Sequence, residues 1–376
     1  MMHQKPDVQR LHILGEEIQE KVISLGLYKE PGTYETSLDN GKITYGEGSS
    51  ITGIEKFLGY YDKKNNIAYS PSISITTDFC TVKSFCKYVE ESNKDAVCLD
   101  DETDKKYTMR AKKALDNFRE LTGITGSFQF YLTRTRAYTS AKGLGESAAV
   151  ASSVARSLIG NVFGAEAAMD RHFVSRCARL VSGSGTRAAI GNTSLWLSYP
   201  GLPAEKSYAI ELPSEVDKLH IAAFPKKSTI ETMSAHDLAV NSPFYEAWLD
   251  KKYTRLKNVL DQGWKLDTLC QVAQSDMFDL NSVILASGAF IQTPESIALI
   301  NAFLGFQKNN ANIYMTTDTG PTIVIMSTDK ELIEGFKKTV PDFCIDGKIV
   351  NNYSLEAKES DRTKAAVYFK SLYRTL

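Results

Sequence analysis

Hydrophobic residues recur along this chain with two different periods, and the period predicts the type of each element. A period of two with many β-branched residues predicts strands. The segments with this pattern are 42–45, 72–77, 127–138, 193–197, 218–224 and the two runs that flank 318–321. Apolar residues at helical spacing predict helices. These helices cover residues 11–27, 103–122, 146–160, 164–181, 244–262, 264–287, 293–307, 329–338 and 359–374. The mixture of elements predicts an α+β fold.

The same pattern divides the chain into an N-terminal extension and two domains. Residues 1–44 carry one amphipathic helix that ends before Pro31, and its apolar face must pack on the body of the protein or on a second subunit. A loop-like stretch at 200–213 predicts a boundary between a domain at 45–212 and a domain at 213–376. The last helix, within the second domain, is a second candidate appendage.

A glycine turn at 139–149 lies between a predicted strand and a helix rich in alanine and serine. Gly143 and Gly145 precede that helix, and small residues at such a place leave room for a phosphate on free backbone N–H groups. Glu146 occupies the first turn of the helix, where its negative charge would repel a phosphate. The turn therefore has the form of a nucleotide-phosphate loop but a charge that does not suit a nucleotide.

Composition narrows the classes of partner and cofactor. The 376 residues are 43% hydrophobic and 24% charged, with a net charge of −1, which gives no reason to expect a nucleic-acid or membrane partner. Six cysteines without a C-x-x-C pair and five scattered histidines predict free thiols and no metal site. The sequence has neither a signal peptide nor an apolar run of membrane-spanning length, so we expect a cytoplasmic protein.

Five segments in a fixed order carry the most specific signal. They read KFLGYYD at 56–62, SPSISIT at 70–76, TSAKGLGESAA at 139–149, SGSGTR at 182–187 and TTDTGP at 316–321. Together they resemble the diphosphomevalonate decarboxylase branch of the GHMP small-molecule kinase superfamily. The resemblance implies a ribosomal-S5-like N-terminal domain and a ferredoxin-like C-terminal domain, with the active site in the cleft between them.

The resemblance also implies roles for residues of these segments. It implies that Arg187 contacts the substrate carboxylate, which suits the paired N–H donors of a guanidinium group. It places Lys56 in the active site and matches Asp318 to the family's catalytic aspartate. The substrate-binding residues it implies, with the 5-phosphate on the serine-glycine loop, are Ser72, Ser182, Gly183 and Ser184. Structural alternatives stay open: a loop-tying arginine, a solvated lysine, an Asx turn and turn-forming serines.

At the glycine turn the chain departs from the ATP-dependent members of the family. Glu146 and Val150 replace small residues and Lys142 replaces alanine, so we expect ATP binding to be impaired. An ordinary surface pair between Lys142 and Glu146 is the alternative. Arg134 and Arg136 alternate onto one face of the preceding strand, and we expect them, with Lys142, to hold a 3-phosphate of the substrate. The alternative is an exposed basic strand edge.

A decarboxylase without ATP needs a substrate that already carries a leaving phosphate at C3. The chain resembles the ATP-independent family members of thermoacidophilic archaea, which implies conversion of mevalonate 3,5-bisphosphate to isopentenyl phosphate, CO2 and phosphate without a cofactor. Asp318 then has no C3 hydroxyl to deprotonate, and could orient Lys56 or Arg187 or destabilise the bound carboxylate. The alternatives are an ATP-dependent diphosphomevalonate decarboxylase, a mevalonate 3-kinase and a non-catalytic metabolite sensor.

One histidine and the oligomeric state complete these expectations. His236 stands where the family has an active-site arginine, so it is either a pH-sensitive phosphate contact or a plain surface histidine. The expected partner is the phosphorylated mevalonate substrate. Because members of the family often dimerise, a homodimer is a further expectation.

Overall fold

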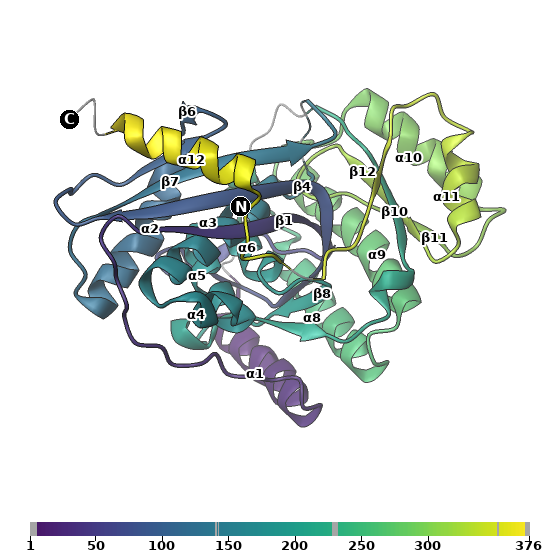
Figure 1. The fold of residues 1–376 in the computed structure, drawn as a ribbon. Helices are drawn as coiled ribbons and strands as arrows, with labels where there is room; N and C mark the ends of the chain where they lie inside the picture. Colours follow the sequence, from purple (N-terminus) through teal and green to yellow (C-terminus); the bar gives the residue numbers. More distant parts are fainter. Residues whose placement is uncertain (1–5, 140, 142, 228–231, 352, 373–376) are drawn as a thin grey trace.

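The structure is a computed structural model that describes residues 6–372 except 140, 142, 228–231 and 352. It has two lobes, each built on a β-sheet with helices packed against it (Figure 1). A small hairpin of β2 (Tyr60–Asp62) and β3 (Ile67–Ala68) joins the first two long strands of the N-terminal lobe.

The N-terminal lobe contains a seven-stranded sheet. Its strands are β1 (Ile43–Glu55), β4 (Ser72–Val89), β5 (Ala96–Leu99), β6 (Glu102–Thr103), β7 (Ser127–Arg136), β8 (Thr193–Trp196) and β9 (Ala209–Leu212). The order is β6-β5-β7-β4-β8-β9, and β1 pairs with β4. Because β4 is long, one part of it pairs with β7 and another with β8, both antiparallel. The predicted strands were therefore correct in type, whereas β5, β6 and β9 were not predicted, and β9 lies in the stretch at 200–213 that the sequence predicted to be loop-like.

The helices of this lobe are α2 (Lys105–Thr122), α3 (Glu146–Val162), α4 (Ala165–Met169), α5 (Arg171–Val181) and α6 (Gly183–Ala188). The helix predicted over 164–181 is interrupted, because the Asp170 side chain accepts the N–H groups of His172 and Phe173 and caps α5. The SGSGTR segment forms the short helix α6, where the sequence predicted a loop.

Glycines in β1 allow α3 to lie very close to the sheet. A Cβ atom on Gly46 would lie 2.5 Å from the backbone nitrogen of Ser157, and one on Gly48 would lie 2.3 Å from the carbonyl oxygen of Ala149. Every residue of α3 from Ala148 to Val162 is buried. The alanine- and serine-rich sequence of α3 is thus the sequence of a central helix, packed at short distance against two strands.

The C-terminal lobe contains a four-stranded antiparallel sheet in the order β11-β12-β10-β13. These strands are β10 (His220–Phe224), β11 (Ile313–Thr316), β12 (Ile323–Ser327) and β13 (Ile345–Gly347). Its helices are α7 (Thr232–Val240), α8 (Tyr245–Asp261), α9 (Leu266–Ala286), α10 (Pro294–Gln307) and α11 (Lys330–Lys337). The sequence predicted all of these elements except α7 and β13.

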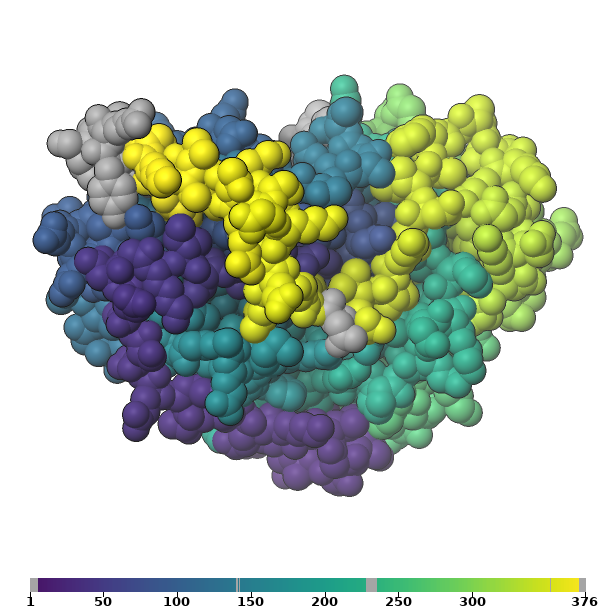
Figure 2. All heavy atoms as spheres, in the orientation of Figure 1, coloured from purple at the N-terminus to yellow at the C-terminus, as the bar shows by residue number. Residues whose placement is uncertain are grey.

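Both terminal helices pack on the body of the protein. Helix α1 (Val8–Ser24) packs on α8 and reaches both lobes, because an Arg10 Nη lies 2.8 Å from Glu246 and His12 lies 2.9 Å from the carbonyl of Pro200. Helix α12 (Glu359–Leu372) packs on β7, and Figure 2 shows the C-terminal segment crossing the N-terminal lobe. Its Asp361 pairs with Lys83 at 2.6 Å. The last helix therefore lies on the first lobe, although its position in the sequence placed it with the second domain.

One hydrophobic core runs through both lobes. It contains Ile73 and Leu195 from the first sheet, Trp248 from α8, Val324 from the second sheet and Leu11 from α1. The six cysteines are free thiols, as the sequence predicted, and five of them are buried. Among the described residues no helix is long and apolar enough to span a membrane.

Candidate active site

The motifs meet where β1 ends against the loop between β11 and β12. Gly53 of β1 donates its N–H to Asp318 Oδ1 at 3.2 Å. A Cβ on Gly53 would lie 2.6 Å from that oxygen and 2.9 Å from Cγ of Lys56. The missing side chain therefore leaves the space in which Asp318 and Lys56, from different lobes, lie next to each other. The glycine turn also comes close, since a Cβ on Gly143 would lie 3.5 Å from Cα of Gly320.

Lys56 is a buried cation with its side chain only 5% exposed. Its Nζ donates to Oγ1 of Thr316 at 2.8 Å and to the carbonyl of Ala273 at 3.3 Å. Burial lowers the pKa of Lys56, while the negative charges of Asp276 and Asp318 act in the opposite direction. The solvated lysine that the sequence left open as an alternative is therefore excluded.

Arg187 lies on α6 and is 3% exposed. One Nη lies 3.4 Å from the carbonyl of Ile73, while the buried Nε has no hydrogen-bond partner. Its guanidinium carbon lies 5.4 Å from the centre of the Phe57 ring. Burial lowers the pKa of Arg187 to about 10, against the opposing charge of Asp318, so the group remains a cation at neutral pH. A buried guanidinium with an unused donor suits a carboxylate ligand.

Asp318 is half-buried beside these two cations. Burial raises its pKa, while Lys56, Arg187 and the N–H of Gly53 oppose the rise. The positive charges of Lys56 and Arg187 therefore offset the cost of burying the charged Asp318 carboxylate.

Several serine and threonine hydroxyls of the same motifs are paired with each other or have no partner among the described residues. Ser182 and Ser184, at the junction of α5 and α6, have their Oγ atoms 3.1 Å apart. Ser72, Ser74 and Thr317 have buried hydroxyl oxygens without a hydrogen-bond partner. Buried polar groups in proteins are normally paired, so a group of unpaired hydroxyls beside Asp318 is consistent with a binding site. Ser74 is the cross-strand partner of Gly53, so its side chain points to the same face as Asp318.

Gly183 of the serine-glycine loop is held against aromatic side chains. A Cβ there would lie 2.8 Å from both Phe57 Cζ and the Tyr60 hydroxyl oxygen. The Tyr60 ring stacks on His236 at 4.8 Å. These contacts join the KFLGYYD segment to α6 and α7, and place Phe57 and Tyr60 beside the helix that carries Arg187.

His236 is buried, with 7% exposure, and is therefore not the surface histidine considered above. Its Nδ1 accepts the N–H of Gly59 at 2.9 Å, which places the proton of the neutral ring on Nε2. Burial lowers the pKa of His236 to about 4. The side chain is therefore neutral near pH 7, and a phosphate contact at this position would use a neutral N–H donor.

We expect His236 to make the protein less stable in acid. The unfolded chain takes up the histidine proton near pH 6.5, whereas the folded chain takes it up near pH 4. The free energy of unfolding therefore falls as pH drops from 6.5 to 4, by about 3 kcal/mol at most from this group. Urea unfolding at several pH values should show a smaller acid loss in His236→Asn. The exposed His220→Asn serves as the control, and an equal acid loss in all three proteins would contradict the expectation.

The acidic residue of the glycine turn is held by two arginines. Glu146 Oε1 lies 2.6 Å from Nη1 of Arg134, and Oε2 lies 2.8 Å from Nη1 of Arg136. Arg134 also pairs with Asp100 at 2.6 Å. Both guanidinium groups thus have carboxylate partners within the chain, which differs from the predicted role of free phosphate holders. Lys142, predicted to act with them, lies outside the described residues.

Sequence reasoning missed another cation at the site. Arg110 of α2 donates to the Ser147 hydroxyl at the start of α3 at 3.3 Å, and its charge acts on both Tyr60 and His236. No ion pair joins it to a carboxylate within the described part of the chain. The only signal in the sequence was its place in a polar helix, which does not distinguish a site residue from a solvated one.

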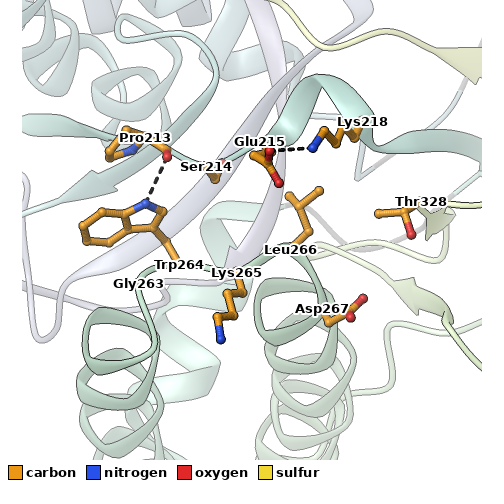
Figure 3. A pocket seen from close by; sticks show the side chains of 10 residues that line it. All are labelled: Pro213, Ser214, Glu215, Lys218, Gly263, Trp264, Lys265, Leu266, Asp267 and Thr328. Atoms are coloured by element: carbon orange, nitrogen blue, oxygen red, sulfur yellow. Dashed lines mark hydrogen bonds and ion pairs between the residues drawn. The ribbon is translucent and has the colours of Figure 1, made fainter.

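Two other features of the structure bear on the site. A surface pocket of about 300 Å³ is lined by residues 213–215, Lys218, residues 263–267 and Thr328, and contains none of the motif residues (Figure 3). The residues that the structure describes contain no group of three or more histidine, cysteine, aspartate or glutamate side chains placed to hold a metal. The motif residues instead gather around Asp318.

Comparisons with known proteins identify the family. Residues 49–209 match the diphosphomevalonate decarboxylase-like N-terminal domain. The mevalonate 3,5-bisphosphate decarboxylase of Thermoplasma acidophilum is 45% identical over 341 residues, which are 91% of this chain and 84% of that protein. The enzyme of the same name from Thermoplasma volcanium is 42% identical over 361 residues, 94% of this chain and 97% of that protein.

Solved structures confirm the predicted GHMP-type fold. Mevalonate diphosphate decarboxylase from Staphylococcus aureus superposes with a TM-score of 0.73 at 21% identity, over 84% of this chain and 99% of that one. The mevalonate-3-kinase of Thermoplasma acidophilum, bound to mevalonate 3-phosphate and ADP, gives 0.69 at 15% identity, over 85% of this chain and 100% of that one. From the identity to the Thermoplasma proteins, the chain belongs to the family of the mevalonate 3,5-bisphosphate decarboxylases.

Proposed function

We propose that this chain is a carboxy-lyase that converts mevalonate 3,5-bisphosphate to isopentenyl phosphate, CO2 and phosphate without ATP. Two relatives with this substrate in their names are 45% and 42% identical to the chain. The observation that carries the proposal is the position of Asp318 beside the buried cations Lys56 and Arg187. Free thiols at the six cysteines fit a reducing compartment, so we place the protein in the cytoplasm.

The reaction needs no redox step and no added nucleotide. The C3–O bond breaks and the phosphate leaves with its electron pair, so positive charge develops on C3. The bond between the carboxylate carbon and C2 then breaks, CO2 leaves, and the bonding pair forms the C2=C3 double bond. The released phosphate takes its proton from solvent. The enzyme must hold the carboxylate, stabilise charge at C3 and assist the departing phosphate.

We assign these tasks to the residues of the cluster. Arg187 orients the substrate carboxylate through its unused Nε–H and an Nη–H. Asp318, with no C3 hydroxyl to deprotonate, places its negative charge near C3, where positive charge develops. Lys56 keeps Asp318 ionised and supplies positive charge toward the departing phosphate.

The phosphates need further contacts. We assign one phosphate to the SGSGTR segment, with Ser182, Ser184 and the backbone of α6, and assign to the unpaired hydroxyl of Ser72 the role of a further donor. We assign to Arg110 the role of phosphate cation that Arg134 and Arg136 were expected to fill, because those two already hold Glu146.

A direct assay tests the proposal. Purified protein is given mevalonate 3,5-bisphosphate in buffer with a chelator and without nucleotide, and isopentenyl phosphate and inorganic phosphate are measured. We expect both products in equal amounts. Product that forms only from a 5-diphosphate substrate with ATP and Mg²⁺ would instead identify an ATP-dependent decarboxylase. Binding of the bisphosphate without turnover would identify a sensor.

In this proposal, the Glu146 side chain is the reason that the protein does not bind ATP. Its carboxylate, fixed by Arg134 and Arg136, occupies the start of α3, where a nucleotide phosphate would meet free N–H groups. The electrostatic cost of bringing a phosphate to about 4 Å from such a charge is of the order of 1 to 4 kcal/mol. The two arginines compensate the charge of Glu146 but leave its side chain in place.

We expect Glu146→Ala to gain affinity for ATP. The substitution leaves Arg134 and Arg136 beside an open helix N-terminus, with Asp100 as the remaining partner of Arg134. Calorimetry should show that the variant binds ATP about tenfold more tightly or better than the wild type. Glu146→Gln, which removes the charge and keeps the side-chain size, separates repulsion from steric blocking. Equal ATP affinity in all three proteins would show that Glu146 does not exclude the nucleotide.

A further inference from the structure

A buried group of charged side chains joins the end of β1 to helices α8 and α9. Glu55 accepts hydrogen bonds from Lys252 at 2.9 Å and from Nε of Arg255 at 2.7 Å. Arg255 also reaches Asp276 at 2.7 Å and Asp279 at 2.6 Å. The side chains of Glu55, Lys252 and Asp276 are fully buried. Buried charges are costly unless they are paired, and the proposed mechanism uses none of these groups.

Asp276 connects this group to the active site. Its Oδ1 accepts from Arg255 and from the indole N–H of Trp248 at 2.8 Å. Its Oδ2 accepts the backbone N–H of Lys56 at 2.9 Å and lies 3.8 Å from Nζ of the same lysine. One carboxylate from the C-terminal lobe therefore contacts both the backbone and the ammonium group of Lys56.

The charges around Lys56 come from four elements. The carboxylates are Asp276 on α9, Asp318 on the loop after β11 and Glu55 on β1, and the opposing cation is Lys252 on α8. Burial opposes the charge of Asp276, yet Lys252, Lys56 and Arg255 lower its pKa to about 2, so it is ionised at any physiological pH. Of the two aspartates, Asp276 is fixed by three hydrogen bonds, whereas Asp318 accepts the N–H of Gly53 and, in the proposed function, faces the substrate.

We propose that Asp276 is a positioning residue, which holds Lys56 at the base of the cluster and keeps its ammonium group charged. The inference rests on the proposed function for the task of Lys56, and adds a residue that lies outside the five motifs. A buried lysine without a nearby carboxylate tends to lose its proton. Asp276 contacts no substrate itself and acts through Lys56.

The test compares Asp276→Asn with Asp279→Asn. Asp279 shares the Arg255 partner but does not contact Lys56, so its substitution weakens the same ion network without touching the lysine. The protonation of Lys56 is followed by NMR of protein labelled with ¹³C at the lysine ε-carbons, and its signal is assigned by its absence in Lys56→Arg. The pH profiles of kcat and KM are measured with mevalonate 3,5-bisphosphate.

We expect Lys56 of the wild type to be protonated at pH 7. In Asp276→Asn the Lys56 signal should titrate at lower pH, and the alkaline limb of kcat should move down by about one pH unit or more. We expect kcat to fall about tenfold or more with a smaller change in KM. Asp279→Asn should lower the thermal midpoint without moving the Lys56 titration or the alkaline limb of kcat. If Asp276 had a purely structural role, Asp276→Asn would give this same result.

Two results would overturn the inference. The first is that folded Asp276→Asn shows the same Lys56 titration as the wild type. The second is that Lys56 of the wild type is neutral at pH 7, which is measured without any variant. If the wild type does not turn over the bisphosphate, the proposed function fails, while the NMR titration still decides what Asp276 does to Lys56.

Discussion

Arg187→Met should lower kcat/KM for mevalonate 3,5-bisphosphate by about a thousandfold or more. The guanidinium group is the buried donor we assign to the substrate carboxylate, and its Nε has no partner within the chain. Losing a charge-assisted paired hydrogen bond that orients the reacting group removes several kcal/mol of transition-state stabilisation. Release of phosphate and isopentenyl phosphate, measured under single-turnover conditions, gives the rate of the chemical step.

Two further variants make this expectation specific. Arg187→Lys keeps the charge but not the planar fork, and we expect an intermediate loss of about a hundredfold. Arg156→Met is the matched control: Arg156 is 2% exposed and donates to the carbonyls of Glu47, Ala168 and Ala189. It should destabilise the fold without changing kcat/KM of the folded enzyme. An Arg187→Met enzyme with activity within threefold of wild type would refute the carboxylate assignment.

Asp318→Asn should lower kcat by about a hundredfold to ten-thousandfold, with a smaller effect on KM. Asparagine has nearly the same shape, so the change removes only the negative charge near C3, which acts most strongly in the transition state. Burial raises the pKa of Asp318, and the carboxylate is ionised only above that value. Wild-type activity should therefore fall as the pH drops through the pKa of Asp318, and the variant should lack this acid limb.

A matched aspartate checks the charge argument. Asp329 caps α11 by accepting the N–H of Glu331 at 2.9 Å, and asparagine caps helices equally well. Asp329→Asn should therefore keep both kcat and the acid limb. If Asp318→Asn retains wild-type kcat and the same pH profile, a charge at C3 plays no part in the reaction.

The sequence predicted the elements well because their hydrophobic periods are strong. Helix α3 and strand β7 were found with their approximate bounds, and the alternation of Arg134 and Arg136 placed them correctly on one face. What the pattern could not tell is that this face meets Glu146 at the start of α3. That contact depends on how the helix lies across the sheet. From the sequence alone the two arginines were expected to be free to bind phosphate, whereas in the fold both pair with Glu146.

The candidate site was predicted where motifs are short and continuous, and missed where contacts join distant parts of the chain. The sequence assigned Lys56 and Asp318 to the candidate site from their motifs, and the structure brings them together, but Asp276 contacts Lys56 across 220 positions and lies in an ordinary amphipathic helix. Helix α12 was likewise placed with the wrong lobe, because nothing in its own sequence identifies the sheet it covers.

The core shared by the two lobes affects how the protein unfolds. Residues of both sheets, of α8 and of α1 belong to one apolar cluster, which lies beside the separate clusters inside each lobe. We expect heating to melt the two lobes together, because a lobe that melted alone would expose the apolar surface of its neighbour to water. We therefore expect the two halves of this chain to unfold as one cooperative unit, so that a destabilising substitution in either half lowers a single melting temperature.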